Sequence, residues 1–189
     1  MQSTSQAEPT DDALMLAYAA GDQGAFARLY ERYRGPLYRY FRRQLSAAEA
    51  DDCFQTLWLK VIDQAPRFRP SGAFQGYLFT VAHNQLMDHF RRRGRLSEVS
   101  ADADEFTDDL ADGSAETPPD ALAREELRQR LLTLLERLPF HQREAWVLKQ
   151  ESALTIEEIA GVTRTSIEGV RSRLRYATVK LKAGLARHV

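Results

Sequence analysis

The distribution of charge divides this chain more sharply than any other feature of its sequence. Residues 96–123 contain nine Asp and Glu and no Lys or Arg, whereas residues 1–95 contain 13 basic and 10 acidic residues and residues 124–189 contain 13 and 8. The acidic stretch is rich in Asp, Ser, Ala and Pro, so it has too little apolar surface to offset the entropy lost on ordering. We therefore predict two basic modules, over 11–95 and 124–189, joined by a flexible acidic linker and preceded by a disordered tail over 1–10.

Composition excludes several classes of protein. The 189 residues are 43% hydrophobic and 28% charged, which is typical of globular domains. The longest apolar run, residues 13–20, is too short to cross a membrane, and no basic or apolar leader precedes Arg28. The single cysteine, Cys53, cannot form an internal disulfide and fits a reducing compartment. We expect a cytoplasmic protein without membrane insertion.

The apolar residues of the first module recur at helical spacing. After a capping box at Ser46, one buried stripe is expected from Ala50, Cys53, Phe54, Leu57 and Val61. We expect helices from a cap at Asp11 or Asp12 to Gly21, from Asp22 with a kink or break at Pro36, from Ser46 to before Pro66, and from Ala73 to Arg93.

The second module has the same character, so the predicted fold class is all-α with two small helical domains. A leucine stripe, Leu127, Leu131, Leu134, Leu135 and Leu138, ends at Pro139, and a helix over 141–151 follows. A short helix from Thr155 to about Val162, a turn and a longer helix then have the order of a helix-turn-helix. The inner face of the longer helix is expected to hold Ile167, Val170, Leu174, Ala177 and Leu181.

The outer face of that longer helix carries residues suited to DNA. Glu168, Arg171, Ser172 and Arg175 are spaced i, i+3, i+4 and i+7, and three of them can donate hydrogen bonds to bases or phosphates. An ordinary helical hairpin with a solvated basic face has the same spacing, so both interpretations stay open at this point.

Longer stretches of both modules resemble a known family, the extracytoplasmic function (ECF) sigma factors of the sigma-70 family of bacterial RNA polymerase. Three segments are similar to its region 2: GDQGAFARLYERYRGPLYRYFRR, EADDCFQTLWLKV and FQGYLFTVAHNQLMDHFRRRGR. Two are similar to its region 4: LERLPFHQREAWVLKQESALTIEEIA and SIEGVRSRLRYATVKLK. Two matches in the right order around a variable linker are more specific than either alone.

The resemblance implies two partners, core RNA polymerase, contacted at its clamp helices and flap, and promoter DNA. It places the polymerase contact on the helix after Ser46, at Asp51, Asp52, Gln55, Thr56 and Leu59. An ordinary solvated helix face is the alternative for these residues. Contact with the upstream −35 element is implied at Ser166, Glu168, Arg171, Ser172 and Arg175.

The resemblance also implies that recognition and melting of the −10 element belong to the loop from Arg67 to Phe74 and to the helix that follows this loop. Aromatic rings stack on unpaired bases while Arg binds phosphate, so this mixture suits single-stranded DNA. The expected contacts are Arg67, Phe68, Arg69, Phe74, His83, Asn84, Asp88, Arg91 and Arg92. Phe79 and Phe90 suit the core as well as a DNA contact.

Several positions depart from the family pattern. Thr163-Arg164 replaces the usual Leu-Gly of the helix-turn-helix, so a non-glycine residue is expected in the tight turn. Gly169 lies inside the longer helix, and His83 stands where the family often has Arg. The linker has two interpretations, a solubilising tether or a segment that imitates nucleic acid near the RNA path of the polymerase.

Thr56 is the departure with the largest chemical consequence. The family commonly has Asp-x-x-Gln-Glu here, whereas Asp52 and Gln55 are followed by Thr56 in this chain. Phosphorylation by a Ser/Thr kinase would add about −1.5 to −2 charge, and Lys60 at i+4 could hold the phosphate. Neutral drift, with Asp51 and Asp52 sufficient for docking, is the other interpretation. An anti-sigma factor is the other class of regulator left open.

The two alternative classes of function are an enzyme and a DNA-binding regulator. His83, Asp88 and His89 form the only close cluster of metal-ligating types, but His83 and Asp88 point about 140° apart on a helix, so we expect no metal site. No phosphate loop or nucleophile motif is present, so we expect no catalytic residues, no cofactor and no enzyme activity. A helix-turn-helix regulator that binds promoters without core polymerase is the stronger alternative.

Overall fold

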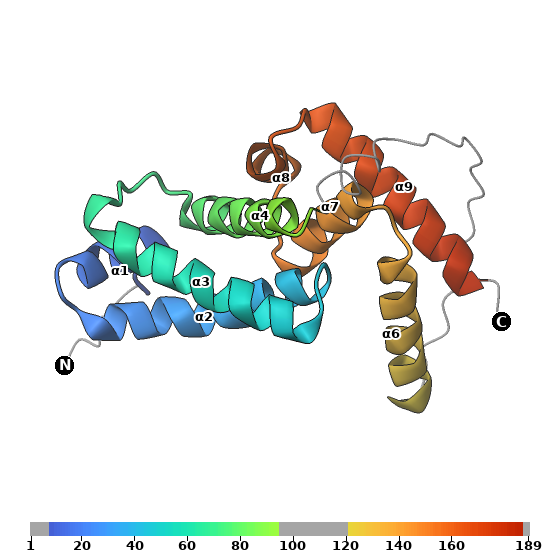
Figure 1. Cartoon of the computed structure of the whole chain (residues 1–189), viewed down its shortest axis with the longest axis horizontal. Helices are drawn as coiled ribbons and strands as arrows, with labels where there is room; N and C mark the ends of the chain where they lie inside the picture. Colours follow the sequence, from blue (N-terminus) through green and yellow to red (C-terminus); the bar gives the residue numbers. More distant parts are fainter. Residues whose placement is uncertain (1–7, 95–120, 187–189) are drawn as a thin grey trace, which may run out of the picture.

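A computed structural model describes residues 8–94 and 121–186, with the side chains of 121–123 left out, and every regular element in these ranges is helical (Figure 1). The all-α prediction is therefore confirmed. Residues 96–120 of the acidic linker and residues 1–7 of the expected tail lie outside the described residues, whereas residues 121–123, expected in the linker, already belong to a helix. The first half contains α1 (Asp11–Ala19), α2 (Gln23–Arg42), α3 (Ala47–Gln64), the 3-10 turn η1 (Ala65–Arg67) and α4 (Phe74–Arg92). The second contains α6 (Ala121–Glu136), α7 (Phe140–Glu151), α8 (Ile156–Thr163) and α9 (Ile167–Ala186).

Local sequence signals begin most of these helices. Ser46 and Glu49 form the expected capping box at α3, and Thr155 and Glu158 form another at α8. At α1 the expected cap was wrong by one residue, because the hydroxyl of Thr10 accepts the Ala13 N–H at 3.3 Å.

Helix α2 continues through Pro36, so the expected break does not occur. A proline removes one backbone donor, yet the apolar face of α2 on both sides of it is buried. Leu29 and Tyr33 before it and Leu37, Tyr40 and Phe41 after it belong to one core cluster. Packing therefore outweighs the local cost of the proline.

In the second half, α9 packs against α7 and α6, and α8 precedes it as the helix-turn-helix requires (Figure 1). Arg164 sits in the turn, which confirms a non-glycine residue there, and its φ of 52° is left-handed. Val170, Ala177 and Leu181 are buried as expected. Leu174 is half-buried, and Ile167, the first residue of α9, and Leu127, in the first half of α6, are exposed instead.

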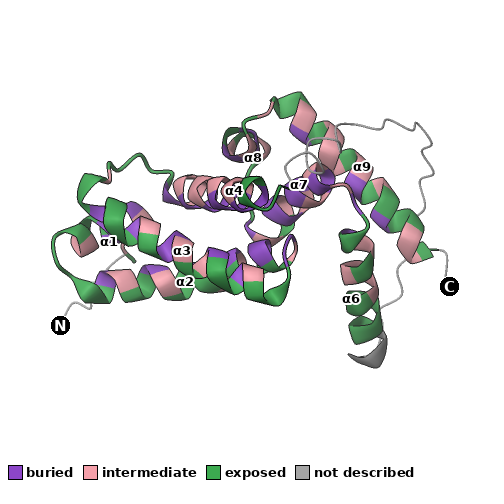
Figure 2. Cartoon of the chain, in the orientation of Figure 1, coloured by how far each residue is buried: buried purple, intermediate pink, exposed green. Residues whose placement is uncertain are grey.

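The two halves pack against each other, α8 on α4 and α7 on α2 (Figure 1). Buried residues of both halves form one continuous cluster, in which the rings of Phe90 and Phe140 meet edge to face at 5.4 Å between centroids. Figure 2 shows the buried positions gathered where α4, α7 and α8 meet. None of the helices within residues 8–94 and 121–186 combines the length and the hydropathy that a membrane span requires.

Candidate functional site

One candidate surface is the outer face of α3. On its inner face Ala50, Cys53, Leu57 and Val61 are buried as predicted, whereas Phe54, expected in the same stripe, is half-buried. Asp51, Asp52 and Gln55 are exposed on the other side, and Leu59 is 59% exposed. An open leucine on the same helix face as polar side chains suits a protein contact, in which the apolar group is covered and the polar groups form the rim.

Thr56 lies at the edge of this surface and is half-buried. Lys60, one turn later, does not reach back toward it. Its ammonium donates a hydrogen bond to the Gln85 side-chain carbonyl on α4 and lies 3.9 Å from the Asp88 carboxylate. The expected partner for a phosphate at Thr56 is therefore already engaged with α4.

A second candidate surface lies along α4 and is basic at its two ends, the loop before the helix and its last turn, which lie about 27 Å apart along the helix axis. Arg67, Arg69, Arg91 and Arg92 are exposed, and Phe68 is half-buried. Arg91 binds the Asp88 carboxylate at 2.7 Å. Each end of α4 therefore carries two exposed arginines, of which Arg91 is paired with Asp88, and these groups can attract phosphate.

Three aromatic residues near this surface belong to the core. Phe79 and Phe90, left open by the sequence, are 0% and 3% exposed. Phe74, expected to contact DNA, is 2% exposed and packs against Tyr33 and Phe68 at 5.8 and 5.7 Å between ring centroids. In this arrangement its ring is a core group and Phe68 is the accessible one.

The second half covers two other expected DNA contacts. His83 is 7% exposed, and its Nδ1 lies 2.8 Å from Oε1 of Glu144 on α7. The Asn84 side-chain carbonyl accepts a hydrogen bond of 3.2 Å from Arg164 in the helix-turn-helix. The middle of α4 is therefore closed off by the contact between the halves.

Glu144 is the centre of that contact, and sequence reasoning missed it. Its carboxylate is fully buried and also accepts the Tyr40 hydroxyl at 2.7 Å. Burial alone would raise the pKa of Glu144, but the hydrogen bond and charge of His83 and the bond from Tyr40 outweigh it, so the pKa is lowered. The available signal was its place in the apolar stripe of α7, four residues after Phe140 and three before Val147.

Further polar contacts surround Glu144 at the same boundary. The guanidinium groups of Arg39 and Arg43 bind Glu151, the latter at 3.2 Å. Arg143 donates to Gln44 at 2.8 Å, and Gln75 donates to the Ser152 carbonyl. Arg39 is half exposed, so its ion pair adds little stability.

The outer face of α9 forms a third surface. Glu168, Arg171 and Arg175 are exposed, Ser172 is half-buried, and Ser166 caps the helix start by accepting the Gly169 N–H at 3.0 Å. Gly169 fits because a Cβ there would lie 2.9 Å from the Thr165 hydroxyl. Arg175 stacks over the Tyr176 ring at 5.0 Å. The predicted DNA-contact residues thus share one open face.

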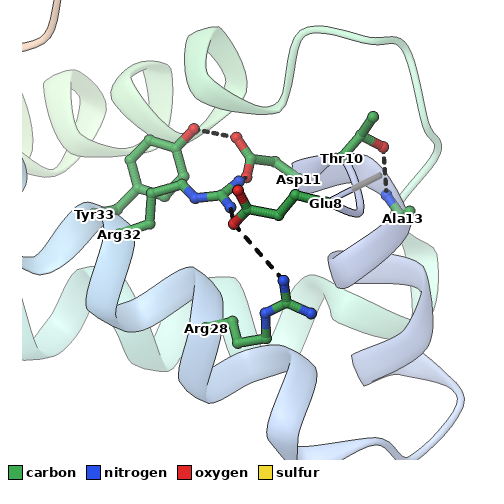
Figure 3. Close-up of polar contacts among 7 residues, drawn as sticks. All are labelled: Glu8, Thr10, Asp11, Ala13, Arg28, Arg32 and Tyr33. Carbon is green, nitrogen blue, oxygen red and sulfur yellow. Dashed lines mark hydrogen bonds and ion pairs between the residues drawn. The ribbon is translucent and has the colours of Figure 1, made fainter. Parts of the chain in front are cut away.

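A polar network holds α1 against α2 (Figure 3). Asp11 accepts hydrogen bonds from Arg32 and from the Tyr33 hydroxyl, and Glu8 binds Arg28 and Arg32. Burial and the bond to Asp11 raise the pKa of Tyr33. The part of the expected tail nearest α1 is therefore engaged with the first half.

Across residues 8–94 and 121–186, no group of three or more His, Cys, Asp and Glu is placed to hold a metal. His83 and His89 have separate protein partners, Glu144 and Glu49.

Comparison with known proteins identifies the family to which this chain belongs. The family model for sigma-70 region 2 matches residues 29–96, and that for sigma-70 region 4 matches residues 128–181. The ECF RNA polymerase sigma-E factor of Escherichia coli strain K12 is 30% identical over 169 residues, covering 87% of this chain and 88% of that protein. The chain belongs to the ECF sigma factors of the sigma-70 family.

Other members of the family agree with this assignment. The RNA polymerase sigma-H factor of Pseudomonas aeruginosa is 31% identical over the same length. This ECF sigma factor is also similar to CnrH, solved in complex with the cytosolic domain of CnrY, with a TM-score of 0.65, 25% identity and coverage of 95% and 99% of the two chains. It shares its fold with the sigma factor RpoE of Bartonella quintana, solved with the anti-sigma factor NepR, at a TM-score of 0.64 and 24% identity over 87% of this chain and 98% of that one.

Proposed function

We propose that this sigma factor binds core RNA polymerase through the outer face of α3 and directs it to promoters that it contacts with α4 and α9. The observation that carries the proposal is the open face of α3, where the exposed Leu59 lies beside Asp52 and Gln55. Apolar surface ringed by polar groups is typical of protein interfaces. The alternative, a helix-turn-helix regulator with residues 1–95 as a dimerisation or sensor module, would use this face for another protein contact, so binding to core polymerase discriminates the two.

The promoter contacts divide between the halves. The exposed Arg171 and Arg175 of α9 suit a duplex major groove, as in other helix-turn-helix proteins. The guanidinium groups around α4, together with Phe68, suit unpaired DNA. We assign the −35 element to α9 and the −10 element to the loop and helix α4.

Run-off transcription with purified core polymerase tests this function. Wild-type protein is expected to start transcription at a promoter selected from a randomised library, and Leu59→Asp is expected to abolish core binding because it places a charge in the apolar centre of the contact. Leu16→Asp on α1, also an exposed leucine, is the matched control and should bind core normally. Promoter footprinting by the chain without core polymerase, with no transcript in its presence, would favour the helix-turn-helix regulator instead.

We also propose that phosphorylation of Thr56 by a Ser/Thr kinase strengthens binding to core polymerase. Thr56 is partly accessible and lies one turn after Asp52, where a phosphate would extend the acidic part of the docking face. To pair with that phosphate, Lys60 would have to leave Gln85 and Asp88 on α4. Phosphorylation would therefore act on the polymerase face and on α4 together.

The kinase proposal is tested by core affinity and run-off activity of four proteins: wild type, Thr56→Ala, Thr56→Glu and kinase-treated wild type. Activity that requires Glu or phosphate supports the switch. Equal, strong activity of untreated wild type and Thr56→Ala contradicts it and leaves neutral drift, or control by an anti-sigma factor of the kind solved with related sigma factors. If Lys60 holds the added negative charge, the double variant Lys60→Ala, Thr56→Glu should be less active than Thr56→Glu alone.

A further inference from the structure

The carboxylate of Asp12 holds a loop that lies 59 and 60 residues further along the chain. One oxygen, Oδ2, accepts the backbone N–H of Ser71 at 2.7 Å and that of Gly72 at 2.6 Å. The side chain is buried, with 8% of the residue exposed, whereas Ser71 and Gly72 face solvent. Hydrogen bonds to a charged acceptor are roughly twice as strong as neutral ones, so this is a firm tertiary anchor.

Few other contacts fix the loop at Ser71 and Gly72, the end next to α4. Ala73 occupies the N-cap of α4 and makes no side-chain cap bond, and the first turn of α4 holds no acidic residue. Gly72 adopts φ +73°, a conformation that the glycine permits but does not enforce. At the other end, the ring of Phe68 packs against Phe74 and Tyr77, so that half of the loop is held by apolar contacts.

The anchored segment forms one side of a cavity of about 440 Å³ at the basic surface. Ser71 lines it together with Arg67, Phe68, Arg69 and Tyr77. A shift of Ser71 and Gly72 would change the shape of this cavity and the path of the chain at Arg69, which lies between Ser71 and the part of the loop held by Phe68. Asp12 touches neither the cavity nor the arginines; it acts on them through the backbone.

We propose that Asp12 is a positioning residue that sets the geometry of the loop over 68–73 and thereby the selectivity for the −10 element; this rests on the function proposed above. An acid at a DNA-binding surface would ordinarily weaken binding by repulsion. Here two backbone N–H groups compensate the charge of the Asp12 carboxylate, and the two hydrogen bonds order the loop.

Three variants separate this role from a loss of folding. Asp12→Ala removes both hydrogen bonds, whereas Asp12→Asn keeps a carbonyl oxygen that can accept them without the charge. Asp11→Ala is the matched control, because it removes an equal charge from the adjacent residue, whose partners Arg32 and Tyr33 lie on α2 and not in the loop (Figure 3).

The measurement is the affinity of each holoenzyme for fork templates with a single-stranded −10 segment, either the sequence selected by the wild-type holoenzyme or a scrambled one. We expect Asp12→Ala to lose about tenfold in the ratio of the two affinities, the effect of about one hydrogen bond, with Asp12→Asn intermediate and Asp11→Ala unchanged. Affinity for core polymerase and for −35 duplex should stay at the wild-type value in all three, which a merely destabilised protein would not show.

Each other outcome has one meaning. Failure of the wild-type holoenzyme to distinguish the two templates would contradict the proposed function itself. Normal discrimination by both Asp12 variants, or an equal loss in Asp11→Ala, would overturn the role of Asp12 and leave the proposed function standing.

Discussion

Glu49 shows how one side chain joins local and tertiary structure. Its Oε2 accepts the N–H and the hydroxyl of Ser46 at 3.2 and 2.6 Å, and its Oε1 lies 3.3 Å from Nε2 of His89 on α4. The Ser46 hydroxyl bond, helped by the Ser46 N–H and by His89 and opposed by burial, lowers the pKa of Glu49 to about 2. The capping box expected from sequence is therefore also a contact between α3 and α4.

We predict that Glu49→Gln costs about 1 kcal/mol of folding free energy at pH 7 and progressively less below pH 4.5. The folded pKa lies below the unfolded value of 4.5, so the charged carboxylate stabilises the fold above that pH and loses its effect as the pH falls toward 2. Urea denaturation at pH 7 and pH 3 measures the difference. Ser46→Ala should show the same pH-dependent loss, added to a pH-independent loss of the cap that its hydroxyl provides to the helix backbone. A cost of Glu49→Gln that does not change with pH would contradict the assignment to Glu49.

At the scale of the helices, α9 presents its DNA-contact residues on the face away from its core. We predict that Arg171→Ala and Arg175→Ala each weaken binding of the holoenzyme to −35 duplex by about 1–3 kcal/mol, the value of one good base contact. Lys180→Ala removes the same charge from the opposite side of α9, where Lys180 lies beside Leu134 of α6. Filter binding at matched salt should leave this control within twofold of wild type, and an equal loss in all three variants would mean a nonspecific charge effect.

Helix α4 should show two separable effects. We predict that Asn84→Ala impairs opening of the −10 element, because a half-buried amide in the middle of the helix can make a directional contact, whereas Arg91→Ala mainly lowers affinity in a salt-dependent way. Permanganate reactivity of the bubble reports opening, and the slope of affinity against salt reports the phosphate contact. Normal opening by Asn84→Ala would show that the melting surface lies elsewhere.

The elements were predictable from sequence to the extent that each is decided locally. Both capping boxes and four of the five residues of the α3 stripe are set by neighbours within one or two turns, and these were predicted. The non-glycine turn at Thr163-Arg164 was also predicted, but the left-handed conformation of Arg164 was not. The unbroken helix at Pro36 was not, because tertiary packing on both sides decides it. The tertiary contacts of Glu144 and Asp12 were not predicted for the same reason, since their partners lie 61 and 60 residues away in sequence.

At the scale of the whole molecule, the contact between the halves governs access to α4. His83 and Asn84 of α4 bind Glu144 of α7 and Arg164 beside α8. Both residues are expected to meet DNA, so the halves must separate at α4 before they can do so. Glu144 is the buried part of this contact, and removing one partner of a buried charged pair costs about 3–5 kcal/mol.

We therefore predict that Glu144→Ala raises the fraction of molecules in which the halves have separated. A cysteine placed at Asn84 reports this opening by its rate of maleimide labelling, against a low background because Cys53 is buried and burial raises its thiol pKa. The labelling rate should rise by about 100-fold or more in Glu144→Ala, since the rate follows the population of the open form and a loss of about 3 kcal/mol raises that population by about two decades. A cysteine at the exposed Asp52 should label equally fast with and without Glu144→Ala. Equal rates at position 84 in both backgrounds would mean that apolar contacts such as Phe90 with Phe140 hold the halves together without the carboxylate.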